Sequence, residues 1–457
     1  MGHDFDLVVV GGGAAGLAAA RTSRRRGATV AMVTEGPPGG DCTFVGCVPS
    51  KTLIAAAADG LAFPAAMERV RATVARVAAA EDAEVLRSEG IEVITGRAAF
   101  VDRRRLRVDG RVIRARRVVV ATGSRPAVPP IAGLDSVEVL TNENVFDLTR
   151  SPGSLLVVGG GPIGAELGQA FARLGVAVTV VEAGPRVLAR EEPEASAIVT
   201  TALRADGVRV VTGRQVARAS AGPDGATLTL DDGSSVTAAR VLVAVGRTPV
   251  TVGLDLERVG VALDQRGYVA TDAHLRTNVE GIYAVGDVTG LSPFTHAADE
   301  MGRIAAGNAL ARVAYRRFHP DRMPAVTYTD PEVARVGCTE QQAAAIDGAR
   351  VAYVPLTEVD RAVTTGRTDG YLKLIAAPRR GLGNLAGGRL VGATVVAAPA
   401  GEMLAAAALA LQTAMFPARL ALTVQPYPTW SLAIRQAAGQ FFVESAGRRA
   451  RPARPGG

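Results

Sequence analysis

Short runs of consecutive apolar residues mark the first half of this chain. The earliest, at residues 6–10, is followed by glycines and then by an alanine-rich segment. Further apolar runs lie at residues 29–34, 118–121, 155–158 and 176–181. Strands of a parallel sheet are buried on both faces, so they read as continuous apolar runs rather than as an alternating pattern. The pattern therefore predicts an α/β fold with parallel strands.

The first apolar run opens a dinucleotide-binding pattern. Gly11, Gly13 and Gly16 form G-x-G-x-x-G, and a predicted helix follows to about Arg26. The next run ends at Glu35, 24 positions after Gly11. The glycines allow a tight turn and close backbone approach, the helix N-terminus faces a pyrophosphate, and the acid accepts a hydrogen bond from a ribose hydroxyl. Strand, turn, helix, strand and acid in this order predict a nucleotide site.

A second copy of this pattern follows later in the chain. Gly159, Gly161 and Gly164 repeat the glycine spacing, a predicted helix follows to Leu174, and the next run ends at Glu182. Two dinucleotide sites in one chain imply two cofactors, and two-electron transfer between them is the natural use. The sequence Val-Ala-Val-Gly-Arg-Thr-Pro, which ends the inserted segment, resembles the earlier Val-Ala-Thr-Gly-Ser-Arg-Pro, which supports two similar domains.

The second nucleotide can be argued from the charges beside its site. An acid at Glu182 accepts a hydrogen bond from a ribose 2′-OH and repels a 2′-phosphate, which favours NADH. Arg186 and Arg190 lie just beyond and could hold the 2′-phosphate of NADPH. Both nucleotides therefore stay open, with NADH favoured.

Two of the three cysteines, Cys42 and Cys47, lie close together with four residues between them. Pro49 and Ser50 give a helix-start signal, and residues 52–58 read as a helix. A helix N-terminus favours a thiolate, and two thiols that can close into a disulfide form a two-electron switch. A structural disulfide, or two unreactive cysteines, is the alternative.

The rest of the chain carries further predicted elements. Helical spacing extends over residues 60–100 and again over 297–311. From about Met323 the pattern changes to alternating strands and one helix, which predicts a separate α+β domain. Short strands are expected at 92–94, 105–108, 111–113, 282–287, 325–328, 334–337, 372–375 and 392–396, and a helix at 402–415.

Composition narrows the function classes. A chain of 457 residues with 48% hydrophobic and 21% charged residues is typical of a globular protein of about three domains. Part of the net charge of +7 comes from four arginines after residue 446, among Gly, Pro and Ala. We expect this tail to be disordered and predict no nucleic-acid binding, because neither aromatic residues nor a binding motif accompany it.

The chain also lacks the signals of a membrane or secreted protein. Its most apolar stretch, residues 390–418, is interrupted by Glu402 and by glycines and prolines, so a buried strand and helix are expected there. The N-terminus has no basic region of a signal peptide. Few cysteines fit a reducing compartment, so we expect a cytoplasmic protein whose paired cysteines are catalytic.

Taken together, these motifs resemble those of the pyridine nucleotide-disulfide oxidoreductases, a family of FAD flavoproteins. The resemblance covers nearly the whole chain. It implies an α/β fold with two Rossmann-like domains, one for FAD and one for NAD(P), and a C-terminal α+β dimerisation domain. The residues that carry it, besides the two glycine motifs, are Gly-Gly-x-Cys-x4-Cys-x-Pro-Ser-Lys at 39–51, Ala-Thr-Gly at 121–123, Gly-Arg-Thr-Pro at 246–249, Ala-Val-Gly-Asp at 284–287 and residues 328–337.

The resemblance implies roles for individual residues. Asp287 would bind the ribityl chain of FAD. Cys47 would lie against the flavin as the charge-transfer thiol, and Cys42 would be the outward, interchange thiol. The expected nucleotide-binding residues are Gly11, Gly13, Gly16, Glu35, Gly40, Lys51, Thr122, Gly123 and Asp287, and, around the second site, Gly159, Gly161, Gly164, Glu182, Arg186 and Gly246.

Lys51 would lie near flavin N5 and pair with Glu166. A cation there stabilises negative charge that develops on the reduced flavin, and a paired carboxylate lowers the cost of burying the cation. The expected organisation is an FAD-binding domain from 1–148 and 267–320, an NAD(P)-binding domain at 149–266, an interface domain at 321–446 and a disordered tail at 447–457. The family's C-terminal domain implies a homodimer whose active sites are completed by the partner.

The sequence departs from the family pattern near its C-terminus. Where disulfide reductases of this family carry a histidine acid/base, this chain has Tyr427, and its four histidines all come earlier. An unperturbed tyrosine pKa of ~10 makes a poor base at neutral pH. A tyrosine there resembles the mercuric reductase branch, although no cysteine follows Phe442. We include Tyr427 among the candidate catalytic residues.

The expected function is electron transfer from NAD(P)H through FAD to the Cys42–Cys47 disulfide and on to an acceptor. A metal ion, as in mercuric reductases, a small disulfide, a quinone and oxygen all remain open as acceptors. Dihydrolipoamide dehydrogenase is the alternative. A flavin-binding redox sensor or scaffold without turnover is the alternative of a different class.

Overall fold

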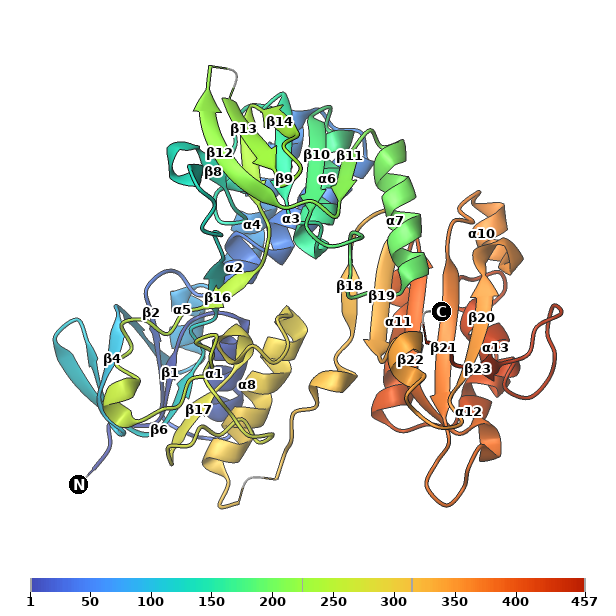
Figure 1. Cartoon of the computed structure of the whole chain (residues 1–457). Coiled ribbons are helices and arrows are strands. Elements are labelled where there is room, and N and C mark those ends of the chain that lie inside the picture. Colours follow the sequence, from blue (N-terminus) through green and yellow to red (C-terminus); the bar gives the residue numbers. More distant parts are fainter. Residues whose placement is uncertain (1, 224, 314, 456–457) are drawn as a thin grey trace. The chain divides into compact units, whose positions relative to one another are not determined.

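The computed structural model describes residues 2–223, 225–313 and 315–455, and the chain forms two compact units (Figure 1). The first unit is built from Met1–Pro129, Leu140–Ser151 and Val243–Pro320, and the second from Pro130–Val139, Pro152–Leu242 and Asp321–Gly457. The fold class predicted from the sequence is confirmed: parallel sheets with helices are followed by a C-terminal antiparallel domain.

The first unit contains a seven-stranded sheet in the order β3-β2-β1-β6-β5-β4, with β17 paired to β6. Strand β1 lies parallel to β2 and β6, and its residues from Leu7 to Val9 are fully buried, as a continuous apolar run predicts. The strands are β1 (Phe5–Val10), β2 (Val30–Thr34), β3 (Ile91–Thr95), β4 (Ala98–Asp102), β5 (Arg105–Val108), β6 (Arg111–Val120) and β17 (Ile282–Ala284), and a separate pair is formed by β7 (Ser124–Pro126) and β16 (Arg247–Pro249).

Two predictions for this sheet need correction. Residues 111–113 and the run ending at 120 belong to one strand, β6, because its first half pairs antiparallel with β5 and its second half pairs parallel with β1. The strand expected at 282–287 ends at Ala284, and Asp287 lies in the short helical turn that follows.

Helices α1 and α8 pack together in this unit (Figure 1). The predicted helix after the first glycine motif is confirmed as α1, which ends at Arg25. The helices of the first unit are α1 (Ala14–Arg25), α2 (Gly40–Phe44), α3 (Cys47–Ala58), α4 (Phe63–Ala78), α5 (Ala83–Ser88) and α8 (Thr295–Leu310).

The second unit begins with a five-stranded sheet in the order β11-β10-β9-β15-β8 and a three-stranded sheet β12-β13-β14. Strand β9 lies parallel to β10, and β10 lies parallel to β11. The elements are β8 (Val139–Leu140), β9 (Ser154–Val158), α6 (Pro162–Arg173), β10 (Ala177–Glu182), α7 (Pro193–Ala205), β11 (Arg209–Thr212), β12 (Val216–Gly222), β13 (Gly225–Leu230), β14 (Ser235–Ala238) and β15 (Arg240–Val243).

The C-terminal part of this unit is a six-stranded sheet in the order β18-β19-β22-β21-β20-β23. Strand β20 was not predicted, and the apolar stretch 390–418 forms β22, α11 and the start of α12. The elements are β18 (Ala325–Thr327), β19 (Glu332–Gly337), α9 (Glu340–Ala343), β20 (Arg350–Pro355), α10 (Asp360–Thr364), β21 (Tyr371–Ala377), β22 (Arg389–Ala397), α11 (Ala400–Gln412), α12 (Pro417–Leu422), α13 (Leu432–Gly439) and β23 (Arg451–Pro452). Among the described residues, no helix is long and apolar enough to cross a membrane.

The expectation of a disordered tail is wrong for part of residues 447–457. Residues 451–452 form β23, which pairs antiparallel with β20. An edge strand leaves backbone groups unpaired, and β23 satisfies some of those of β20. The Arg451 guanidinium also forms an ion pair with the fully buried carboxylate of Glu340, which needs a cation. Gly456 and Gly457 lie outside the described residues.

Candidate active site

The two cysteines lie on consecutive helices of the first unit. Cys42 is in the five-residue helix α2, and Cys47 is the first residue of α3. Helix α3 therefore begins just before Pro49 and Ser50, where the pattern predicted the helix start, and Gly46 is its N-cap. This start places the Cys47 side chain at the positive end of the helix dipole. Cys42 is partly buried and Cys47 is exposed.

The two thiols contact one another and Thr295. The hydrogen bond between the Cys42 and Cys47 side chains raises the pKa of Cys42, burial raises it further, and a hydrogen bond from Thr295 lowers it. The Thr295 Oγ1 also lies 3.3 Å from Cys47 Sγ. The two cysteine side chains and Thr295 therefore form one hydrogen-bonded group. Sequence reasoning missed Thr295, whose position at the start of α8 was its one available signal.

The first glycine motif leaves an open helix terminus. A Cβ at Gly11 would lie 2.2 Å from Ala121 O, and one at Gly16 would lie 2.0 Å from Gly11 O, so both positions require glycine. Gly13, the N-cap of α1, makes no side-chain cap, and a Cβ there would meet nothing closer than Gly40 Cα at 3.9 Å. Backbone N–H groups at an uncrowded helix N-terminus fit a pyrophosphate, so these residues fit the ADP half of FAD.

Asp287 lies in a polar cluster of the first unit. Its Oδ2 accepts a hydrogen bond of 2.8 Å from Ser124 Oγ and lies 3.6 Å from Arg247 Nε. Burial raises the pKa of Asp287, while Ser124 and Arg247 oppose this rise. A partly buried carboxylate with a fixed hydrogen-bond partner fits the role of accepting a hydroxyl of the FAD ribityl chain.

The other residues predicted around FAD have different surroundings. Glu35 is exposed and lies 3.4 Å from Arg97. The Thr122 hydroxyl donates a hydrogen bond of 2.6 Å to Val250 O. Gly123, and Gly246 of the residues predicted for the second nucleotide, both have positive φ and open space where a side chain would be, so backbone there can approach a ligand.

The second glycine motif repeats this arrangement in the second unit. A Cβ at Gly164 would lie 1.9 Å from Gly159 O, whereas Gly161, the N-cap of α6, has open space around it. The Glu182 carboxylate accepts hydrogen bonds of 2.6 Å from the N–H groups of Gly160 and Gly184. The acid is therefore fixed beside the glycine loop, where a ribose would bind.

Arg186 is oriented by its own loop. Its Nη2 donates hydrogen bonds to Ala189 O at 2.9 Å and Glu191 O at 3.4 Å. Arg190 is exposed. A 2′-phosphate would thus compete with backbone carbonyls for the Arg186 guanidinium.

Lys51 and Glu166 belong to different units, so their expected pairing stays a prediction. Lys51 is half-buried on α3. Glu166 is buried on α6, and its Oε1 accepts a hydrogen bond of 2.8 Å from the Tyr328 N–H.

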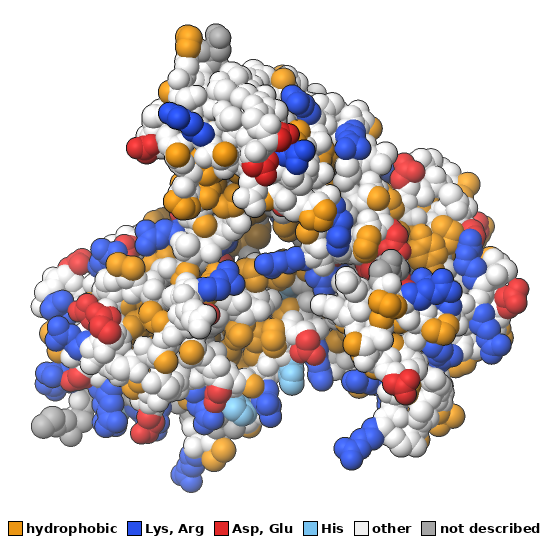
Figure 2. All heavy atoms as spheres, viewed as in Figure 1, with side chains coloured by type: hydrophobic (Ala, Val, Ile, Leu, Met, Phe, Trp, Pro, Cys, Tyr) orange, Lys and Arg blue, Asp and Glu red, His pale blue; other side chains and the backbone are white. Residues whose placement is uncertain are grey.

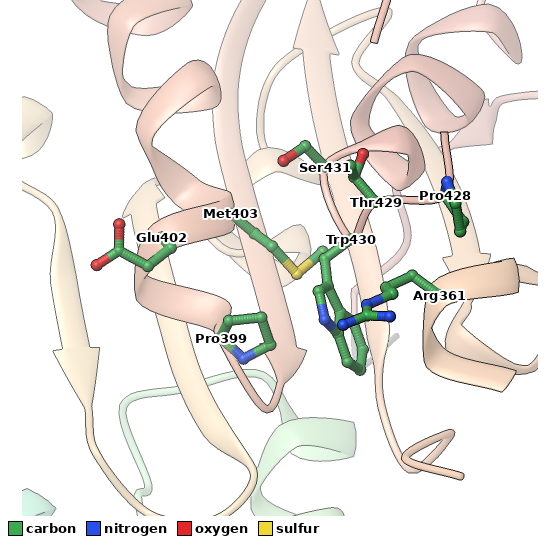
Figure 3. Close-up of a pocket in the computed structure, with 8 residues that line it drawn as sticks. All are labelled: Arg361, Pro399, Glu402, Met403, Pro428, Thr429, Trp430 and Ser431. Carbon is green, nitrogen blue, oxygen red and sulfur yellow. The ribbon is translucent and has the colours of Figure 1, made fainter. Parts of the chain in front are cut away.

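Tyr427 lies on the loop between α12 and α13, with 72% of its surface exposed. A hydrogen bond between its hydroxyl and Asp360 raises the pKa of Tyr427, so it is less readily ionised than a free tyrosine. The residues that follow it border a pocket of about 360 Å³ (Figure 3). Its lining residues are Arg361, Pro399, Glu402, Met403, Pro428, Thr429, Trp430 and Ser431.

The third cysteine and a histidine next to Thr295 were not among the predicted site residues. Cys338 follows β19, is partly buried against a small apolar cluster, and burial raises its pKa to about 11. The His296 ring stacks on Phe294 with centroids 5.5 Å apart.

Comparisons with known proteins match almost the whole chain. The family model for pyridine nucleotide-disulphide oxidoreductases matches residues 5–302, and the model for the dimerisation domain of that family matches residues 323–438. A mercuric reductase of Streptomyces lividans is 38% identical over 472 residues, which cover 97% of each chain. A dihydrolipoyl dehydrogenase of Thermus scotoductus is 34% identical over 462 residues, covering 95% of this chain and 96% of the relative.

Solved structures also resemble this chain over nearly its whole length. The Cu(II) complex of RclA, an HOCl-induced flavoprotein disulfide reductase from Escherichia coli, has a TM-score of 0.87 and 28% identity. The match covers 96% of this chain and 99% of RclA.

Proposed function

Because this chain belongs to the pyridine nucleotide-disulphide oxidoreductase family, we propose that it reduces a metal ion through Cys42 and Cys47. It is an FAD-dependent oxidoreductase with NAD(P)H as electron donor, and its dimerisation domain supports a homodimer. The acceptor, the residue roles and a cytoplasmic location, which would keep the thiols reduced, are the proposed parts.

FAD, when bound, supplies two-electron transfer between a nicotinamide and a disulfide. The open N-terminus of α1 at Gly13 would hold its pyrophosphate, and Asp287 would hold its ribityl chain. At the second glycine motif, Glu182 would accept the ribose 2′-OH of NADH. NADH is the proposed donor because Glu182 is fixed in place, whereas Arg186 is already bonded to its own loop.

The reduced thiol pair would bind the metal. The Cys42 and Cys47 side chains share a hydrogen bond, so a soft cation that binds both sulfurs displaces the thiol proton between them. The electrons balance without a further reductant: one NADH reduces one Hg(II) to Hg(0), or two Cu(II) to two Cu(I), and yields NAD⁺ and one proton.

The observation that carries this choice is the state of Tyr427. A disulfide acceptor needs a proton for the thiolate that leaves it, and a histidine acid/base supplies that proton in many reductases. Tyr427 is bonded to Asp360, which raises its pKa and makes it a poor acid/base at neutral pH. A metal ion takes up electrons without a proton, so it does not need such a group. The 38% identity to a mercuric reductase agrees with this choice.

A second candidate function is dihydrolipoyl dehydrogenase, favoured by the 34% identity to the Thermus scotoductus enzyme. It requires that a group other than Tyr427 exchange protons with lipoamide. One experiment separates the two functions, because both use the same donor and the same thiols.

The test is an acceptor panel on the purified holoenzyme without oxygen. NADH and NADPH are each offered with Hg(II), Cu(II) or lipoamide, and nicotinamide oxidation is followed. We expect NADH with a metal ion to be fastest. The variant Cys42→Ser should slow metal reduction by about 100-fold or more, since one of two ligands that act as a unit is lost. Cys338→Ser, a thiol outside the proposed pair, is the matched control.

Two results would contradict the proposal. One is lipoamide turnover faster than that of both metal ions, which would establish the second candidate. The other is metal turnover that Cys42→Ser leaves unchanged, which would remove the thiols from the reaction.

A further inference from the structure

The segment that carries Cys42 has little order of its own. Helix α2 has five residues and no side-chain cap, and isolated helices of that length are unstable. Glycines flank it on both sides: Gly39 and Gly40 have φ of +120° and +62°, and Gly46 follows it. Glycine adds backbone freedom in the unfolded segment. The position of Cys42 therefore depends on contacts with more distant parts of the first unit.

Arg247 supplies such a contact from 206 residues away. Its Nη2 forms an ion pair with Asp41, the residue directly before Cys42. The guanidinium is itself fixed, because Nε donates to Ser124 Oγ at 2.6 Å and Nη2 donates to Ser124 O at 2.7 Å. Only 20% of the Arg247 side chain is exposed. An ion pair to a fixed, bonded arginine orders its partner more than a pair of mobile surface chains does.

Asn142 extends this network to the other side of Cys42. Its Oδ1 accepts a hydrogen bond of 3.5 Å from Arg247 Nη1, and its Nδ2 donates one of 3.2 Å to Val45 O. Asp41 and Val45 lie on either side of Cys42 in the chain. The segment between the glycines is thus held at two points by one connected set of side chains.

Arg247 also lies between two acids. Its Nε is 3.6 Å from Asp287 Oδ2, while its Nη2 binds Asp41. Burial is the main cause of the raised pKa of Asp287, and the negative charge of Asp41 adds to it. Loss of the arginine would therefore leave two carboxylates that repel one another, which is worse than loss of Asp41 alone.

We propose that Asp41 is a positioning residue for the thiol pair: through Arg247 it fixes α2 so that the Cys42 thiol faces Cys47. This proposal rests on the proposed function, since it takes Cys42 and Cys47 as the reacting pair. Asp41 fills the variable position of Gly-Gly-x-Cys-x4-Cys, so motif matching assigns it no role. Its acidic side chain gives this chain an anchor that a neutral residue in that position would lack.

The first test compares Asp41→Asn with wild type in the NADH-reduced holoenzyme. Hydrogen exchange of the amides of residues 41–45 should become about fivefold faster, the size of one lost ion pair. The alkylation rate of Cys42 by iodoacetamide, read by peptide mass spectrometry, should change with it. Asp102→Asn is the matched control, because Asp102 also pairs with an arginine and is 43% exposed, against 47% for Asp41. The proposal would be overturned if Asp41→Asn and Asp102→Asn had the same exchange rates at residues 41–45 and the same Cys42 alkylation rate.

The second test uses the repulsion between the acids. Arg247→Met should increase exchange and alter Cys42 alkylation more than Asp41→Asn does. The double variant should lie closer to wild type than Arg247→Met, because Asp41→Asn removes one of the repelling charges. Arg247→Lys keeps a positive charge, so its exchange and alkylation rates should lie between those of wild type and Arg247→Met. A double variant whose exchange and alkylation differ from wild type more than those of Arg247→Met contradicts the proposal. If Arg247→Met does not fold, the comparison of Asp41→Asn with its control is the test.

Failure of the positioning role of Asp41 can be distinguished from failure of the proposed function. If Cys42→Ser abolishes turnover while Asp41→Asn leaves exchange and alkylation unchanged, the thiol chemistry stands and the positioning role fails. If Cys42→Ser keeps full turnover, the proposed function fails whatever Asp41→Asn does to exchange.

Discussion

At the scale of single residues, the replacement of a histidine by Tyr427 gives a prediction. Tyr427→His should raise lipoamide reduction by about 10-fold or more, since a positioned acid/base contributes roughly 10²–10⁴ and this variant lacks the rest of the family motif. Metal-ion reduction should change by less than about threefold, because it needs no proton from this position. Steady-state rates with both acceptors measure the effect. Tyr427→Phe is the control, and equal rates for the His and Phe variants with lipoamide would argue against the reasoning from Tyr427.

At the same scale, local chemistry was predictable from the sequence and distant contacts were not. Gly11 and Gly164 could be predicted because each is required by backbone only a few residues away or on the adjoining strand end. Thr295 and Arg247 contact the thiol segment from 248 and 206 residues away, and no pattern within a short window marks them. The site was therefore predictable in its cofactor motifs and incomplete around its thiols.

At the scale of elements, strong local signals gave the right type of structure with imperfect boundaries. Helix α3 begins at Cys47 rather than at Pro49, because proline is tolerated throughout the first helical turn and so marks the turn but not its first residue. Strands β20 and β23 were missed. Strand β20 is defined by its pairing with β21 and β23, and β23 by its pairing with β20, which joins residues about 100 positions apart. Composition alone made the arginine-rich tail look disordered.

The paired tail gives the prediction at this scale. Arg451→Ala should lower the free energy of unfolding by about 1–2 kcal/mol, because it removes a partly exposed cation from the buried Glu340 carboxylate and loosens β23. Thermal unfolding of the holoenzyme measures the loss. Arg449→Ala, in the same tail but at an exposed position, should leave the midpoint unchanged. If the tail contributes nothing to stability, Arg451→Ala and Arg449→Ala should have the same unfolding midpoint.

At the scale of the whole molecule, charge is spread over the face seen in Figure 2, and a charged cluster is buried in the second unit. Figure 2 shows basic and acidic side chains interspersed over the visible face, which agrees with a +7 chain that does not concentrate its charge there. Inside the second unit, Lys373 Nζ lies 3.4 Å from Glu192, 2.9 Å from Glu194 and 3.0 Å from Glu340. Glu192 and Glu194 lie in the segment matched by the first family model, and Lys373 and Glu340 lie in the segment matched by the dimerisation-domain model. The cluster therefore connects the two matched segments.

The loss of Lys373 should destabilise the protein in a pH-dependent way. Lys373→Met removes the cation that Glu192 and Glu194 share and leaves Glu340 with Arg451 alone, at a cost of about 3–5 kcal/mol near neutral pH. Burial already raises the pKa of Glu192 and the Lys373 ammonium opposes this rise, so without the ammonium the pKa of Glu192 must rise further. An acid with a raised folded pKa binds its proton more readily when folded, so its charge opposes folding as pH rises.

The stability deficit of Lys373→Met should therefore be smaller at pH 5 than at pH 8. Denaturant unfolding of wild type and variant at both pH values measures it. The control is Arg71→Met, which breaks an exposed pair on α4 and should cost less than about 1 kcal/mol at either pH. A deficit that does not depend on pH would show that the cluster acts by packing.

The burial of Lys373 has a practical consequence for chemical labelling. The chain has 51 basic residues, but only Lys51 and Lys373 carry a side-chain amine, and Lys373 is fully buried. An amine-directed reagent applied to the folded protein without FAD therefore has Lys51, half-buried on the helix that begins with Cys47, as its accessible lysine, and the flavin expected beside Lys51 should protect it in the holoenzyme. A dye or cross-linker placed there would report on the neighbourhood of the thiols, and immobilisation through surface lysines would fail.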